Sequence, residues 1–85
     1  MPDAMLHVAS AVVKARPAAQ DAVAREIAAL AGADVLAVDH GRIIVVLEAS
    51  CHHDLAGNLD RIAVLDGVLS AVLVFEHAEP EGDPT

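Results

Sequence analysis

A chain of 85 residues has room for one domain with a two-layer core. Its hydrophobic fraction of 55% exceeds the usual value of about 45–50%, which excludes disorder as its main state. It carries 5 Lys and Arg against 13 Asp and Glu, so its net charge is −8. Nucleic acid is not expected as a partner, because a nucleic-acid binder needs a basic surface. A basic peptide suits this net charge better. Insertion into a membrane is not expected either.

The first strand and the first helix are predicted in residues 6–32. Residues 6–14 are rich in Val and predict a strand. An amphipathic helix is expected from Pro17, which is favoured at a first helical position, to about Gly32. Its apolar residues recur at helical spacing and are Val23, Ile27 and Leu30.

Residues 34–39 and 42–48 predict a hairpin of two further strands. His40 and Gly41 lie between them and fit a compact turn in which Gly41 takes a positive φ. Residues 43–47 are all apolar, so both faces of this strand are apolar.

The second helix is expected after Ser50, a favoured N-cap residue, and Asp54 lies in its first turn. Gly57 interrupts this helix, and the sequence does not explain it. The apolar positions of the helix are Leu55, Leu59 and Ile62. Residues 68–76 predict the last strand. Residues 1–77 are expected to form a single domain, and residues 78–85 an acidic, flexible tail.

The order of these elements predicts an α+β fold of the ferredoxin-like βαββαβ type. Right-handed crossovers place both helices on one face of a four-stranded antiparallel sheet. Side chains alternate between the faces of a strand, so odd-numbered and even-numbered positions should face opposite sides. The odd-numbered positions suit packing under the helices and are Ala9, Ala11, Val13, Ile43, Val45, Leu47, Leu69, Leu73 and Phe75.

The even-numbered positions are expected on the uncovered face and form the candidate peptide-binding site. These positions form a surface with an apolar centre and polar ends. Lys14 and Arg42 are also even-numbered and belong to its polar ends. The site residues are Val8, Ser10, Val12, Ile44, Val46, Glu48, Ser70, Val72, Val74 and Glu76. An apolar patch of this kind marks either a binding surface or a homodimer interface. A β-bulge would reverse the alternation beyond it.

Catalytic and metal sites are not expected in this sequence. Cys51, His52 and His53 are adjacent and would point in different directions on a helix, whereas zinc needs four converging donors. A thiol at a helix N-terminus also needs a base and an oxyanion site, which are not evident. The loop of residues 14–20 has neither the paired cysteines of a copper chaperone nor the Gly-rich phosphate cradle of an acylphosphatase. The chain is therefore predicted to be no enzyme and to use no cofactor.

A cytoplasmic location is expected from three features. A single cysteine fits a reducing compartment. Residues 1–5 lack the basic and apolar regions of a signal peptide. The apolar runs fall short of the roughly 20 residues that a membrane span needs.

Three segments carry a resemblance to a known family: VASAVVKA at 8–15, GRIIVVLEA at 41–49 and DGVLSAVLVFEH at 66–77. Their order and spacing resemble the NapD family of cytoplasmic assembly chaperones for periplasmic nitrate reductase. The resemblance implies a ferredoxin-like fold and binding of the twin-arginine (Tat) signal peptide of the catalytic subunit, which restrains export until cofactor insertion is complete. It also implies that the apolar part of the peptide lies on the uncovered face, and that Glu48 or Glu76 pairs with an arginine.

Two other functions stay open from the residues themselves. The first is an ACT-like regulatory domain that binds a small ligand, although the loop at Ala15–Pro17 offers little for a ligand pocket. The second is a structural homodimer that buries the uncovered face.

Overall fold

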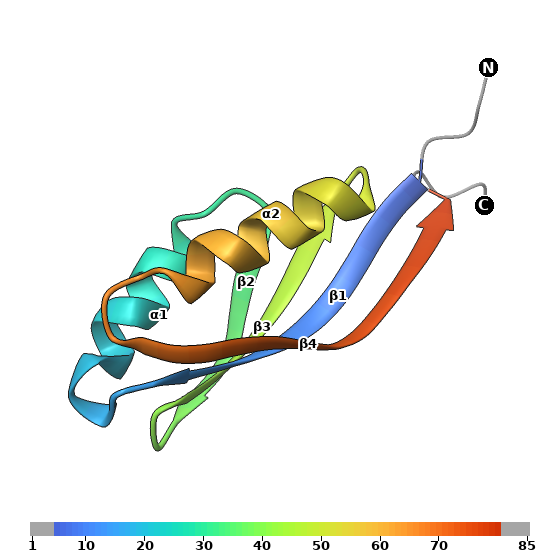
Figure 1. Ribbon diagram of the computed structural model, residues 1–85. Helices are drawn as coiled ribbons and strands as arrows, with labels where there is room; N and C mark the ends of the chain where they lie inside the picture. Colours follow the sequence, from blue (N-terminus) through green and yellow to red (C-terminus); the bar gives the residue numbers. More distant parts are fainter. Residues whose placement is uncertain (1–4, 81–85) are drawn as a thin grey trace.

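The computed structural model describes residues 5–80, and its elements follow the predicted order (Figure 1). The strands are β1 (Met5–Ala15), β2 (Ala33–Asp39), β3 (Arg42–Ala49) and β4 (Val68–Pro80). A short 3-10 helix (Pro17–Ala19) leads into α1 (Gln20–Ala28), and α2 (His52–Ala63) connects β3 to β4. Pro17 therefore starts a helical turn, as expected, but the α-helix itself begins three residues later.

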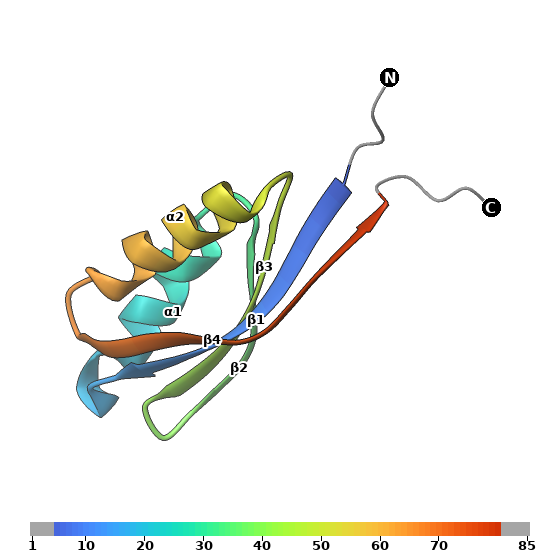
Figure 2. The ribbon, with the colours of Figure 1, turned by 45° about the vertical axis from the view of Figure 1, so that its right-hand side comes forward.

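The strands form one antiparallel sheet of order β2-β3-β1-β4. β1 and β3 are its central strands, and β2 and β4 are its edges. Both α-helices lie on the same side of the sheet, and no other described element lies on the opposite side (Figure 2). The predicted ferredoxin-like fold is confirmed.

The hydrophobic core lies between the helices and the sheet. On the sheet side it contains the odd-numbered residues of β1 and β3: Ala9, Ala11, Val13, Ile43, Val45 and Leu47, all fully buried. On the helix side it contains Val23, Ile27, Leu55 and Ile62, also fully buried. Leu30 and Leu59 are half-buried against this core. The helical stripes and the alternation on the two central strands were therefore predicted correctly.

The β2–β3 turn has a positive φ at both of its central residues, 52° at His40 and 79° at Gly41. This pair matches the type I′ turn that suits the twist of a two-residue hairpin. The Gly41 N–H donates a hydrogen bond to Gln20 Oε1 at 2.6 Å, and a Cβ on Gly41 would lie 2.7 Å from the Ala15 carbonyl oxygen. The glycine thus lets the hairpin pack closely against the end of β1.

Three β-bulges interrupt the edge strands. The paired residues pass from Val35 to Ala37 in β2, from Val68 to Ser70 in β4, and from Leu73 to Phe75 in β4. The skipped residues are Leu36, Leu69 and Val74, with exposed fractions of 64%, 64% and 59%. Leu69 was expected under the helices, and this prediction is wrong because the residue occupies a bulge.

Two predicted boundaries differ from the structure. The N-cap of α2 is Cys51, without a side-chain hydrogen bond, and not Ser50. β4 continues to Pro80, where it pairs with Met5 of β1, so residues 78–80 belong to a strand and not to a tail. Residues 1–4 of the expected domain and residues 81–85 of the expected tail lie outside the described residues.

Candidate functional site

The side of the sheet that carries no helix is called the open face here, and the strand register defines its residues. Directly paired residues of antiparallel strands point to the same side of a sheet. The even-numbered residues of β1 and β3 lie opposite the buried ones, so they and their partners form the open face. Its residues are Leu6, Val8, Ser10, Val12 and Lys14 of β1; Asp34, Ala37 and Asp39 of β2; Arg42, Ile44, Val46 and Glu48 of β3; and Ser70, Val72, Phe75, His77 and Glu79 of β4.

Most of the predicted site residues meet on this face. They are Val8, Ser10, Val12, Ile44, Val46, Glu48, Ser70 and Val72. Val12 lies between Ile44 on β3 and Val72 on β4, so three aliphatic side chains form a row across the sheet. Val12, Ile44 and Val46 are half-buried by their neighbours, and Val72 is 54% exposed. The centre of the open face is therefore apolar and in contact with solvent.

Glu76 is the clearest correction. It pairs with Ala9, a fully buried residue, and therefore lies on the helix side of the sheet. Its Oε2 lies 2.7 Å from His52 Nδ1 at the start of α2, and 3.8 Å from His7 Nδ1. The cause is the bulge at Val74, which adds one residue to β4 and reverses the alternation beyond it. Val74 itself is skipped in this register and is 59% exposed, so the pairing does not assign it to a face and its expected place on the uncovered face stays a prediction.

Phe75 is the residue that the sequence prediction missed. It was expected in the core, but it pairs with Ser10 on the open face and is 58% exposed. It is the only aromatic residue among Phe, Tyr and Trp in the chain. Its ring centroid lies 5.4 Å from that of His77, which lies on the same face. No residue in the sequence marks the bulge, since Val74 and Phe75 are both apolar and either one fits an outward position.

The charged residues of the open face are largely separated by sign, with Asp39 beside Arg42 as the exception. Glu48, Asp34 and Glu79 lie toward the end where β1 begins and β4 ends. Lys14 and Arg42 are paired neighbours at the opposite end. Arg42 and Glu48 are six residues apart on β3, which at about 3.3 Å per residue places them roughly 20 Å apart. The open face thus has an acidic end, an apolar centre and a basic end.

A hollow of about 250 Å³ lies at the basic end of the open face. Its lining combines aliphatic and charged side chains: Ala37, Asp39, His40, Arg42 and Ile44. The Asp39 carboxylate already contacts a neighbouring side chain, because its Oδ1 lies 3.2 Å from His40 Nε2. The hollow adjoins the apolar row through Ile44, so the apolar surface continues into it.

The Cys51–His53 segment is not part of a cluster of potential metal ligands among the described residues. Within residues 5–80, no group of three or more His, Cys, Asp or Glu side chains is placed to hold a metal ion. Cys51 is an exposed free thiol, and the imidazole of His52 is directed to Glu76 instead.

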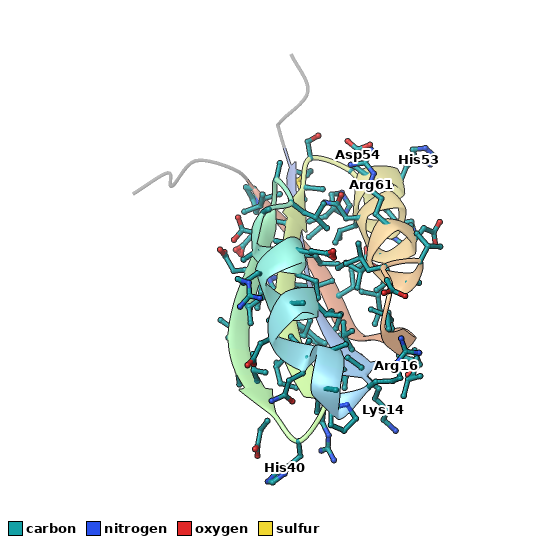
Figure 3. The ribbon with its side chains drawn as sticks, turned by 90° about the vertical axis from the view of Figure 1, so that its left-hand side faces the viewer. Lys14, Arg16, His40, His53, Asp54 and Arg61 are labelled. Atoms are coloured by element: carbon teal, nitrogen blue, oxygen red, sulfur yellow. The ribbon has the colours of Figure 1, made fainter. Side chains whose placement is uncertain are left out.

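A second cavity, of about 290 Å³, lies on the other side of the molecule, against α2. It is lined by Ala31, His53, Asp54, Gly57, Asn58 and Arg61. Figure 3 shows His53, Asp54 and Arg61 together on this helix. A Cβ on Gly57 would meet no atom within 4 Å, so packing inside the chain does not require this glycine.

No helix within residues 5–80 is long and apolar enough to cross a membrane.

Together, the fold and the open face define a ferredoxin-like α+β domain whose second sheet face is left uncovered. The sequence matches the family model described as "NapD protein" over residues 6–80, and the chain belongs to this family. The chaperone NapD of Paracoccus pantotrophus is 41% identical over 75 residues, covering 88% of this chain and 67% of that protein. The chaperone NapD of Escherichia coli K12 is 30% identical over 81 residues, covering 93% of each chain.

A solved structure agrees with this assignment. It is described as the solution structure of the E. coli Tat proofreading chaperone protein NapD. It matches with a TM-score of 0.79 at 29% identity, covering 94% of this chain and 86% of that one. The family members are named as chaperones, which is a non-enzymatic role, so the chain is a chaperone and not an enzyme.

Proposed function

We propose that this chaperone binds the twin-arginine signal peptide of the catalytic subunit of periplasmic nitrate reductase in the cytoplasm, and restrains export until cofactor insertion is complete. The observation that carries the proposal is the open face, which has an apolar centre next to an acidic end. A twin-arginine peptide combines a basic and an apolar segment, so it is complementary to such a face in both respects. The relative described as a Tat proofreading chaperone supports the same proposal.

The apolar segment of the peptide would lie on the centre of the open face. Val12, Ile44 and Val72 form the aliphatic row there, and Phe75 adds an exposed aromatic ring one pair further along. Burying such side chains stabilises a complex by about 25 cal/mol for each Å² of apolar surface removed from water. Aromatic residues often dominate interfaces of this type.

Glu48 is the proposed partner of an arginine. It is exposed on a central strand, next to the apolar centre, and it forms no ion pair with another residue of the described chain. A carboxylate accepts two parallel hydrogen bonds from a guanidinium, which gives both affinity and geometry. Glu76, the other carboxylate considered from the sequence, lies on the helix side and is not part of this proposal.

Calorimetric titration of the chain with the signal peptide of the catalytic subunit tests the proposal. Saturable binding is expected at a one-to-one ratio. The matched control is the same peptide with both arginines replaced by glutamine, which should bind at least tenfold more weakly, a difference of about 1.4 kcal/mol. No saturable heat at high micromolar peptide would contradict the proposal. A dimer that buries the open face and resists excess peptide in sedimentation would favour the structural homodimer instead.

A further inference from the structure

We infer that the signal peptide lies on the open face in one direction only, with its arginines at the end of Glu48 and its apolar segment running toward Lys14 and Arg42. This inference rests on the proposed function and adds the orientation of the partner. It is carried by the separation of charge along the open face, which the proposed function by itself does not require.

The acidic end offers carboxylates to the arginines without a competing lysine or arginine. Glu48 pairs in register with Val8, Glu79 with Leu6, and Asp34 with Val46, so all three lie on the open face. Among the described residues of this half of the open face there is no Lys or Arg. His77 pairs in register with Val8, and its Nε2 lies 3.4 Å from Glu79 Oε1. An arginine that arrives here therefore meets three carboxylates and no Lys or Arg on the described part of the face.

The basic end would repel the same arginines. Lys14 and Arg42 are direct cross-strand partners, and both are exposed. Neither forms an ion pair within residues 5–80. Asp39 faces Arg42 from the edge strand, but it also contacts His40, so the two cations are only partly compensated. Figure 3 shows Lys14 and His40 at the same end of the molecule, away from His53 and Asp54.

The order of segments in a signal peptide converts this charge separation into a direction. Basic residues come first in such peptides, and the apolar segment of about 7–15 residues follows. With the arginines at Glu48, the apolar segment crosses Val46, Ile44 and Val12 and reaches the hollow at the basic end. In the reverse direction the arginines would meet Lys14 and Arg42. The remainder of the partner protein would accordingly emerge beside the β2–β3 turn at His40 and Gly41.

Paramagnetic broadening in NMR spectra of the unmodified 85-residue chain tests the direction. Two signal peptides are used, one with a nitroxide before the arginines and one with a nitroxide after the apolar segment. The first peptide should broaden the amide signals of Glu48 and His77 at least threefold more than those of Arg42 and Ser70. The second peptide should give the opposite ratio.

Charge reversal supplies the matched test of the cause. In the double variant Lys14→Glu and Arg42→Glu both ends of the open face are acidic, so the first peptide should broaden both ends and the ratio should fall to about one. The control is Arg25→Glu with Arg61→Glu, which makes the same change in net charge on the two helices and should keep the ratio. Reversed or equal broadening in the unmodified chain would overturn the direction and leave the proposed function standing. Absence of any binding in the titration would instead overturn both.

Discussion

The Nδ1 of His52 lies 2.7 Å from the Oε2 of Glu76, across the gap between the start of α2 and β4. This contact places the Glu76 carboxylate on the helix side of the sheet, with His7 Nδ1 at 3.8 Å from the same oxygen. Glu48, six residues beyond Arg42 on β3, lies on the open face. The two glutamates that the sequence made equivalent therefore have different surroundings and different expected roles.

Replacing each glutamate by glutamine separates these roles. Glu48→Gln should weaken binding of the signal peptide about fivefold, because an exposed ion pair contributes up to about 1 kcal/mol. Glu76→Gln should leave the affinity within about twofold and lower the free energy of unfolding by about 0.5–1 kcal/mol, since it weakens the hydrogen bond with His52. Calorimetric titration and urea unfolding measure the two effects. If only Glu76→Gln lost affinity, the arginine would bind Glu76, and its assignment to Glu48 would be wrong.

Phe75→Ala tests the place of the aromatic ring. The variant should keep its stability within about 0.5 kcal/mol, as expected for an exposed position, whereas a core Phe→Ala change costs about 3–5 kcal/mol. Its affinity for the signal peptide should fall about tenfold, which corresponds to about 1.4 kcal/mol. Val64→Ala is the control, because Val64 is 81% exposed at the end of α2 and lies away from the open face. Strong destabilisation by Phe75→Ala would show that the ring is buried in the core and not exposed on the open face.

The sequence predicts the central half of the sheet well and the edge strands less well. In β3 both faces are apolar, but the two-residue His40-Gly41 turn constrains the register and Arg42 and Glu48 flank the run at outward positions, so the buried positions Ile43 and Val45 were predicted correctly. In β4 the alternation is ambiguous, because Val72, Leu73, Val74 and Phe75 are all apolar and no glycine marks the bulge. The inserted residue is accommodated by strand twist and pairing with β1, which are tertiary effects that local spacing does not encode.

A charge at the centre of the open face should separate binding from folding. Val72→Asp introduces a carboxylate at a position that is 54% exposed, so the chain should stay folded with a loss of about 1 kcal/mol or less. Its affinity for the peptide should fall at least tenfold. Val45→Asp should unfold the domain, because Val45 is fully buried and an unpaired buried charge costs several kcal/mol. Circular dichroism and calorimetry check both variants, and normal binding by folded Val72→Asp would move the site off this face.

Salt should slow association more than it speeds dissociation. The chain carries a net charge of −8 and the peptide is basic, so long-range attraction contributes to the encounter rate. The Debye length falls from about 10 Å at 0.1 M salt to about 3 Å at 1 M. The association rate constant in stopped-flow measurements should therefore fall several-fold over this range, while the dissociation rate, set mainly by apolar contact, changes less. An association rate constant that does not depend on salt would show that long-range attraction does not contribute to the encounter.

The pairing of Met5 with Pro80 has a practical consequence for protein engineering. Since β1 begins where β4 ends, a short linker between these residues would allow circular permutation, with new termini opened at the His40-Gly41 turn. In the natural chain order, a fluorophore attached near Met5 or Pro80 would sit beside the acidic end of the open face and report the arrival of the arginines. In the permuted chain a fluorophore attached at the new termini, beside His40 and Gly41, would sit at the basic end, so the two reporters would view one bound peptide from its opposite ends.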